Sequence, residues 1–314
     1  MEELLRQQTG YTYSLLVDNV FTAWKIAFLV NDIHEETTVL ASAFAPYAYA
    51  TQHHNIEYID VTLEGSIDPR MLKKAKSSSA LVLHHFTTPV NDLQQTNLCS
   101  IEDLTQMLGN VIPREHRLET AIVDFEELIQ IKAAALLFDD KEKYHKASQF
   151  ASKGLEAKKF WNFDVSLPAF NSILEPRFTP ILHEEFQNFL STHAVRKEKA
   201  LFLNEIFSAH RLLQPTSIDE CSSFLFYPLL LVPELYCPKE EIYAALIEQG
   251  LDISVHHKPI YKLKAFKEDV SLFVTEELYK SELSISLTSE HSKEDLVQII
   301  ENILEKYRFV GCLF

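Results

Sequence analysis

The hydrophobic positions along the first half of the chain predict helices that alternate with strands. Between Tyr13 and Asp32, apolar residues recur every three or four positions, as they do on one face of a helix. Short apolar runs typical of strands follow at residues 37–44, 56–61, 80–86, 120–125 and 133–138. This alternation favours an α/β fold with a mostly parallel sheet and helices on both faces.

A polar signal adds one helix to this pattern. Ser100-Ile101-Glu102-Asp103 has the sequence of a capping box, and apolar Leu104, Met107 and Leu108 come behind it. We therefore expect a helix to begin near residue 100.

The pattern changes beyond about Pro215. It predicts a strand over residues 222–232, a helix from Pro238 to Gly250, a second strand over 252–256, and a last helix opened by Ser292 and Asp295. Residues 178–210 are rich in charge and helix formers, which indicates a long connecting helix. We thus expect a large α/β domain over residues 1–177, a connecting helix over 178–214 and a small α+β domain over 215–314.

Composition indicates an ordinary globular protein and narrows its partners. The chain has 314 residues, 46% of them hydrophobic, and it opens with Glu2, Glu3 and Arg6 instead of a signal peptide. No run approaches eighteen apolar residues, so we expect a cytoplasmic protein without a membrane span. The net charge of −16 disfavours nucleic acid, whose phosphates require Lys and Arg.

Cysteine and glycine spacing excludes several classes of site. The four cysteines lie far apart and form no C-x-x-C pair, so we expect neither a metal site nor a disulfide framework. The six glycines are equally scattered, and no phosphate-binding loop can be written from them. Kinases, GTPases and Rossmann dehydrogenases are therefore excluded.

Two polar residues lie where parallel sheets bind ligands. Asp124 follows the apolar run that ends at Val123, and His85 ends the run that contains Leu81 and His84. Both are expected at the carboxyl ends of strands, which is where open α/β sheets place ligand groups. An exposed carboxylate or a helix N-cap is the alternative interpretation of Asp124.

Several segments together resemble the DegT/DnrJ/StrS family of pyridoxal-phosphate (PLP) nucleotide-sugar aminotransferases. The C-terminal segments EEIYAALIEQGLDISVHHKPIYKLKAF (240–266) and TEELYKSELSISLTSEHSKEDLVQIIENIL (275–304) follow its closing pattern. The segments TTVLASAFAPYAYA (37–50), SSSALVLHHFTTPVND (77–92) and TAIVDF (120–125) are similar to its strands more loosely.

The resemblance implies a fold-type-I aminotransferase and assigns residues to roles. Asp124 would protonate the pyridine nitrogen of the cofactor, and Asn162 would reach the cofactor of the neighbouring subunit in a homodimer. His85 matches a family histidine, and the C-terminal segment supplies candidate substrate contacts at His256, His257 and Tyr261. The substrate implied is a nucleotide sugar of glycan or polysaccharide biosynthesis.

The same comparison indicates that the catalytic lysine segment is missing. The family holds its cofactor as a Schiff base to a lysine on the strand and loop after the aspartate strand, and Lys132 is the only lysine left there. The phosphate clamp falls on Asn19-Val20-Phe21, which lacks the small residues that let N–H groups approach phosphate. Glu127 replaces a family glutamine and adds negative charge. We therefore expect a narrowed cleft that binds PLP weakly or not at all, and no cofactor.

Three hypotheses of function follow. The first is a non-catalytic homologue that keeps the fold and the dimer as a binding or regulatory subunit. The second is an enzyme of altered, lysine-independent chemistry on a sugar or nucleotide sugar, with His85, Asp124 and Glu127 as acid and base groups. The third is residual aminotransferase activity through Lys132 or through a partner subunit that completes the site.

Overall fold

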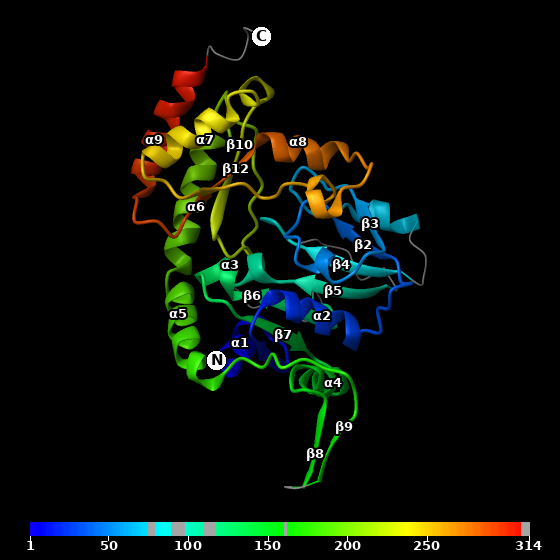
Figure 1. Cartoon of the computed structure of the whole chain (residues 1–314). Helices are drawn as coiled ribbons and strands as arrows, with labels where there is room; N and C mark the ends of the chain where they lie inside the picture. The colour runs from blue at the N-terminus through cyan, green and yellow to red at the C-terminus, as the bar shows by residue number, and fades with distance from the viewer. Residues whose placement is uncertain (75–78, 89–97, 110–116, 160–161, 309–314) are drawn as a thin grey trace.

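The computed structural model describes residues 1–74, 79–88, 98–109, 117–159 and 162–308, and seven of the described strands form one sheet. The strand order is β1-β7-β6-β5-β4-β2-β3 (Figure 1). The bounds are β1 (Tyr13–Val17), β2 (Val39–Ser42), β3 (Ile56–Ile59), β4 (Ala80–His84), β5 (Cys99–Asp103), β6 (Thr120–Asp124) and β7 (Ala134–Phe138). Strands β2 to β6 pair in parallel, and β7 runs antiparallel to both neighbours. The predicted mostly parallel α/β sheet is confirmed.

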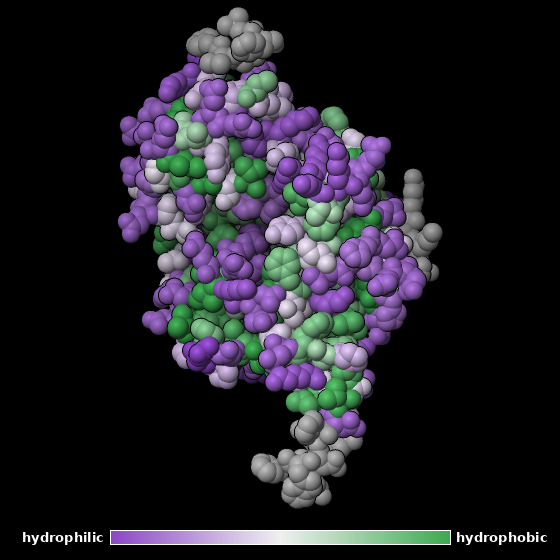
Figure 2. Space-filling view, viewed as in Figure 1, coloured by the Kyte–Doolittle hydropathy of each residue, from purple (hydrophilic) through white to green (hydrophobic). Residues whose placement is uncertain are grey.

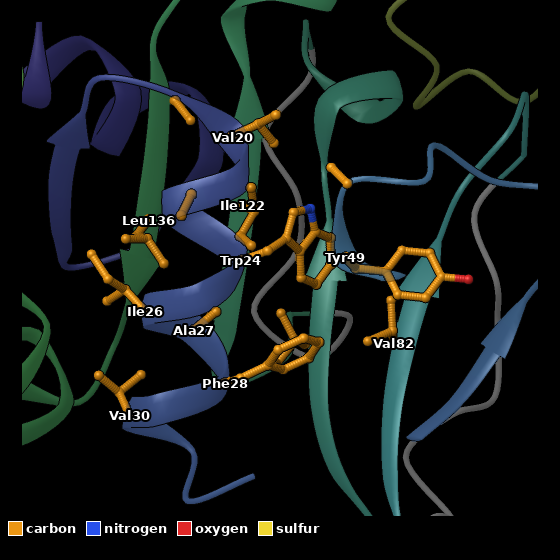
Figure 3. Packing of buried hydrophobic residues seen from close by; sticks show 14 of the residues in the cluster. Val20, Trp24, Ile26, Ala27, Phe28, Val30, Tyr49, Val82, Ile122 and Leu136 are labelled. Carbon is orange, nitrogen blue, oxygen red and sulfur yellow. The ribbon is translucent and has the colours of Figure 1, made fainter. Parts of the chain in front are cut away.

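Helices cover both faces of this sheet because its strands are apolar on both sides. In β6, Ile122 packs with α2 (Val20–Val30) and α4 (Lys141–Ala151). Its neighbours Ala121 and Val123 pack on the other face with α1 (Glu2–Thr9), α3 (Phe125–Ile129) and α5 (Thr179–Ser191). Figure 3 shows Trp24 and Phe28 of α2 turned toward the strands, with Ile26 on the other side of the helix. Buried apolar area on two faces is the main source of stability in such a layer.

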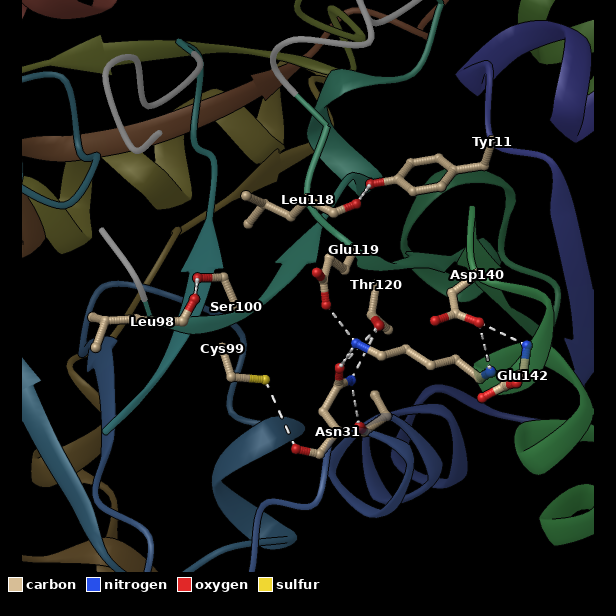
Figure 4. A network of polar contacts seen from close by, with 12 residues as sticks. Tyr11, Asn31, Leu98, Cys99, Ser100, Leu118, Glu119, Thr120, Asp140 and Glu142 are labelled. Carbon is tan, nitrogen blue, oxygen red and sulfur yellow. Dashed lines mark hydrogen bonds and ion pairs between the residues drawn. The ribbon is translucent and has the colours of Figure 1, made fainter. Parts of the chain in front are cut away.

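A polar network closes the edge of the sheet where β5 and β6 begin (Figure 4). The Lys143 ammonium donates to Asn31 Oδ1 at 2.8 Å and to Glu119 Oε2 at 2.6 Å. Asn31 Nδ2 donates to Thr120 Oγ1 at 3.0 Å, and Cys99 lies beside the Asn31 carbonyl. These contacts tie α2 and α4 to the starts of β5 and β6.

The C-terminal part forms a second layer around a three-stranded antiparallel sheet of order β10-β12-β11. Its elements are α6 (His193–Phe207), β10 (Phe226–Leu230), α7 (Lys239–Glu248), β11 (Ile253–Ser254), α8 (Phe273–Ser281), β12 (Glu282–Ser286) and α9 (Lys293–Tyr307). The predicted capping box of the last helix is present, since Ser292 Oγ accepts from the Asp295 N–H at 3.1 Å. Within the described residues, no helix combines the length and the apolar character needed to cross a bilayer.

Three predicted helices differ from the structure. Residues 13–17 form strand β1, because both faces of this run are buried where it pairs with β7, and the helix begins only at Val20. Residues 99–103 form strand β5 between β4 and β6, so Ser100 begins no helix. The connecting helix is two helices, α5 and α6, that meet at Thr192.

A hairpin is among the elements that were not predicted. Strands β8 (Leu155–Lys159) and β9 (Asn162–Val165) pair as an antiparallel hairpin. In Figure 1 this hairpin extends away from the large sheet, at the end opposite the small one. An isolated two-stranded ribbon is marginal in water, so a ribbon that leaves its own domain is typical of an arm that packs against another surface.

Candidate functional site

Three polar residues converge at the carboxyl edge of the large sheet. His84, Asp103 and Asp124 end the adjacent strands β4, β5 and β6. Each comes two positions after a strand residue that packs in the same core cluster as α2: Val82, Ile101 and Ile122 respectively. Because side chains alternate along a strand, all three lie on the α2 face.

Asp103 is the ionised acid of this group. It is buried, its Oδ1 accepts from the Thr105 N–H at 3.0 Å, and its Oδ2 lies 3.7 Å from His84 Nδ1. Burial raises the pKa of Asp103, but His84 and Thr105 outweigh burial and hold the pKa below its ordinary value. Both ring nitrogens of His84 are buried without a hydrogen-bond partner. An ionised acid beside unpaired polar atoms is a signature of a functional position.

Asp124 has a structural contact instead. Its carboxylate accepts from the Glu126 N–H at 2.9 Å and so caps α3, which is the alternative that the sequence left open. Burial and the nearby Asp103 raise the pKa of Asp124 to about 7. Of the two strand-end acids, Asp103 is therefore the better partner for a protonated ring nitrogen.

Glu127 lies on α3 and is bonded to Gln106, which follows β5. Burial, Asp103 and Asp124 raise the pKa of Glu127 to about 8. At pH 7 Glu127 therefore carries a proton, and the negative charge that we expected there is largely absent.

His85 lies on the face of the sheet opposite Asp124. Its Nε2 bonds Glu102 Oε1 at 2.7 Å, and both side chains are buried. The structure thus separates His85 from Asp124 and Glu127, and it brings His84 to Asp103 in its place. The alternation of side chains along β4 was the signal in the sequence that places His84 and His85 on opposite faces of the sheet. Asp103 was missed because its segment was interpreted as a helix cap.

Lys132 and Asn162 lie apart from this edge group. Lys132 is exposed and lies between α3 and β7, two residues before that strand begins. Asn162 begins β9 and pairs with Lys159 in the projecting hairpin, so it does not belong to the carboxyl edge of its own sheet.

A pocket of about 660 Å³ lies between α3, α5, α6 and the small sheet. Its lining is mostly polar: Glu126, Glu127, Gln130, Glu185, Asn188, Thr192, Arg196, Asp252, Ser254, His256, Ser284, Ser286 and Thr288, with the apolar Leu128, Ile129, Phe189, Leu225 and Phe226. Figure 2 shows the surface hollowed between the two sheets, with mainly hydrophilic residues around the hollow. None of the described lining residues is a lysine.

The C-terminal candidates divide between this pocket and the core. His256 lines the pocket, and His257 lies between it and His84, with ring centroids 4.8 and 5.5 Å away. Tyr261 is buried, and its hydroxyl donates to Glu276 Oε1 at 3.2 Å, away from the pocket lining. Among the residues described, no cluster of His, Cys, Asp or Glu has the arrangement of a metal site.

Comparison with known proteins fixes the family. Residues 127–304, more than half of the chain, match the DegT/DnrJ/EryC1/StrS aminotransferase family. The chain belongs to this family. It is 24% identical over 339 aligned positions to the UDP-4-amino-4,6-dideoxy-N-acetyl-beta-L-altrosamine transaminase of Campylobacter jejuni, with 98% of this chain and 90% of the relative covered.

Solved structures show the same fold. PseC of Helicobacter pylori, an aminotransferase of pseudaminic acid biosynthesis, superposes with a TM-score of 0.85 at 18% identity, covering 98% of this chain and 90% of PseC. NtdA of Bacillus subtilis, solved with bound cofactor PMP, superposes with a TM-score of 0.81 at 16% identity, covering 97% and 76%.

Our expectation of no cofactor is wrong. The chain belongs to an aminotransferase family, and a similar structure carries PMP, the amine form of PLP, so a PLP-type cofactor is indicated. The carboxyl edge fits the ring of that group in part, because Asp103 is an ionised acid with His84 beside it. The N-terminus of α2 has a favourable dipole for phosphate, although Asn19 already occupies the Thr22 N–H. None of the described residues at this edge or in the pocket lining is a lysine that could link to the cofactor.

Proposed function

We propose that this chain binds a nucleotide sugar and a PLP-type cofactor but forms no covalent link between that cofactor and a lysine of its own. On this proposal it does not complete transamination alone. The observation that carries the proposal is the five-residue helix α3, which joins β6 almost directly to β7 where the family has its lysine loop.

The chemistry of the remaining residues supports this proposal. When bound, the cofactor supplies an electron-withdrawing ring, and Asp103 would orient that ring through its nitrogen. Moving a proton at the substrate carbon requires an amine held beside the ring. Helix α3 presents Glu127, Leu128 and Ile129 to the pocket instead of an amine.

A nucleotide sugar is the ligand class we favour. The curated relative acts, by its name, on a UDP-linked amino sugar, and the pocket here is lined by hydroxyl, amide and carboxyl groups that suit sugar hydroxyls. Cytoplasmic location and a role in glycan biosynthesis belong to the same proposal.

We further propose a homodimer. The β8–β9 hairpin extends from the body (Figure 1), and Leu155 and Val165 on it are 40% and 54% exposed. These two residues are partners in the hairpin register, so they offer one apolar contact to a second copy.

Two assays test the proposed function together. Calorimetric titration with UDP-N-acetylglucosamine should give saturable binding, and incubation with PLP and L-glutamate should yield no 2-oxoglutarate above a protein-free control. Stoichiometric turnover of glutamate would contradict the non-catalytic part of the proposal. Absence of nucleotide-sugar binding would contradict the ligand class.

Lysine-independent chemistry is the second candidate, and one observation favours it. Glu127 and His256 both line the pocket, one holding a proton and the other neutral at pH 7, as an acid and a base would be. Conversion of the nucleotide sugar without any amino donor, followed by mass spectrometry, would identify this activity.

A further inference from the structure

A closed chain of hydrogen bonds holds the imidazole of His256 at the pocket wall. Its Nδ1 lies 2.7 Å from Ser284 Oγ, and the Ser284 hydroxyl donates to Glu282 Oε1. The other carboxylate oxygen, Oε2, accepts from the His256 backbone N–H at 2.8 Å. The ring also stacks on Phe226, with centroids 4.5 Å apart. Ring orientation and backbone are thus fixed by the same carboxylate.

The direction of these bonds determines the tautomer. The Ser284 hydroxyl has one proton, and because that proton goes to Glu282, Ser284 Oγ accepts from His256 Nδ1–H. A neutral imidazole protonated at Nδ1 carries its lone pair on Nε2. Burial and the nearby His84 lower the pKa of His256 to about 4, so the ring is neutral at pH 7.

Glu282 is buried, and burial raises its pKa above the ordinary value, a rise that Ser284, Lys239 and the His256 N–H oppose. Its two oxygens accept from the Ser284 hydroxyl and from the His256 N–H, which is the arrangement that the carboxylate form makes. Lys239 lies on α7 outside the pocket lining and donates to the Tyr279 carbonyl. Its positive charge is the local compensation for the buried carboxylate.

The pocket that His256 lines contains neutral and acidic groups and one cation, Arg196, whose guanidinium donates to the backbone carbonyls of Phe189 and Ser223. Since Nδ1 is turned to Ser284, Nε2 is the ring nitrogen left for a ligand, and the wall continues with Ser254, Ser286 and Thr288. Carboxylates of Glu126, Glu185 and Asp252 also line the pocket and disfavour an anionic group there. A hydroxyl donor fits this wall better than a phosphate.

We infer that His256 Nε2 accepts a hydrogen bond from a sugar hydroxyl in this pocket, and that Ser284 and Glu282 are positioning residues that keep Nε2 unprotonated. The inference rests on the proposed function, because it takes the sugar of a nucleotide sugar as the ligand. It adds which part of the ligand enters the pocket and which nitrogen receives it.

The tautomer can be measured on the full chain by ¹⁵N NMR of the histidine rings. The His256 signals are assigned by their loss in His256→Gln. We expect Nδ1 to be protonated and Nε2 unprotonated in the wild type at pH 7. Ser284→Ala should abolish this preference, while Ser286→Ala, which removes a hydroxyl from the same strand and pocket but not from the chain of bonds, should preserve it.

UDP-N-acetylglucosamine is then the probe for the ligand half of the inference. Its addition should move the His256 Nε2 resonance in the wild type but not in Ser284→Ala. A protonated Nε2 in the wild type, or an unchanged tautomer in Ser284→Ala, would overturn the inference. If calorimetry shows that the probe binds but the His256 Nε2 resonance does not move, the inference is overturned while the proposed function stands.

Discussion

At the scale of single residues, three acids near one strand edge carry different charges because each has different neighbours. Asp103 is stabilised as the carboxylate by His84 and Thr105, and its charge in turn favours protonation of Asp124 and Glu127. The cluster therefore holds one full negative charge with two protonatable carboxyls around it at neutral pH.

Asp103→Asn should weaken binding of PLP about tenfold to a hundredfold, because a charge-assisted hydrogen bond is worth roughly 1.5–3 kcal/mol. Asp124→Asn is the matched control and should change the affinity little, since Asp124 caps α3. Equilibrium dialysis with PLP measures both. Equal losses in the two variants would contradict the assignment of the ionised acid.

Glu127→Gln should alter how stability depends on pH. The pKa of Glu127 is raised in the folded state, so the native protein binds a proton that the unfolded chain has released, and stability falls between about pH 4.5 and 8. The loss is at most about 1.4 kcal/mol per pH unit. Urea unfolding at pH 5, 6, 7 and 8 should show a flatter profile for Glu127→Gln than for the wild type. Glu126→Gln, at an exposed neighbour, should keep the wild-type slope.

Asp124 and Asp103 also show which site residues can be predicted from the local sequence and which cannot. Asp124 was found because an apolar run precedes it directly, and its role as a helix cap was a stated alternative. Asp103 was missed because Ser100 to Asp103 satisfies a helix-cap pattern locally, whereas pairing with β4 and β6 makes the segment a strand. Such pairing joins residues far apart in sequence and cannot be seen in a window of ten.

At the scale of elements, the last helix and most of the short apolar strands were predicted, and a few strands were not. The last helix has its predicted capping box, and β2, β3, β4, β6, β7 and β10 lie within the predicted apolar runs. Strand β12 was not identified, although its burial on both faces makes it the centre of the small sheet. The hairpin was missed because its strands are only five and four residues long, so the apolar alternation of Leu155 with Ala157 and of Phe163 with Val165 is too short to indicate a strand.

Asp60 joins the two layers and offers an element-scale prediction. It follows β3, and its carboxylate accepts from the Val274 and Thr275 N–H groups at 3.0 and 2.8 Å and from Thr275 Oγ1 at 2.8 Å. Asp60→Ala should lower the free energy of unfolding by about 1–3 kcal/mol, because the N-terminus of α8 loses its acceptor. Asp60→Asn, which keeps an acceptor oxygen, should lose less. Guanidinium unfolding compares the two, and equal stabilities would contradict the capping role.

At the scale of the whole molecule, the fold is that of an aminotransferase family, with a large sheet and a smaller one that each pack against a hydrophobic core. We propose that the family's lysine loop is absent between β6 and β7, where the five-residue helix α3 lies. Sequence resemblance identified the family correctly, but its inference that no cofactor is used went beyond what a missing lysine implies.

The dimer is a prediction about the whole molecule. Val165→Asp should shift the wild-type dimer toward monomer, because a charge would be buried against the second copy at the apolar base of the hairpin. Asp164→Asn, at an exposed adjacent position, should leave the dimer intact. Multi-angle light scattering at micromolar concentration distinguishes the two. A monomeric wild type would contradict the proposal.

The central claim is that the cofactor forms no covalent bond with a lysine of this chain, and one measurement tests it directly. The purified protein is incubated with excess PLP, reduced with borohydride, and analysed by intact mass spectrometry with peptide mapping. We predict no stoichiometric cofactor adduct on any lysine, although PLP binds before reduction. A single reduced adduct on one lysine peptide, lost in Lys132→Met, would contradict the account and assign the catalytic amine to Lys132.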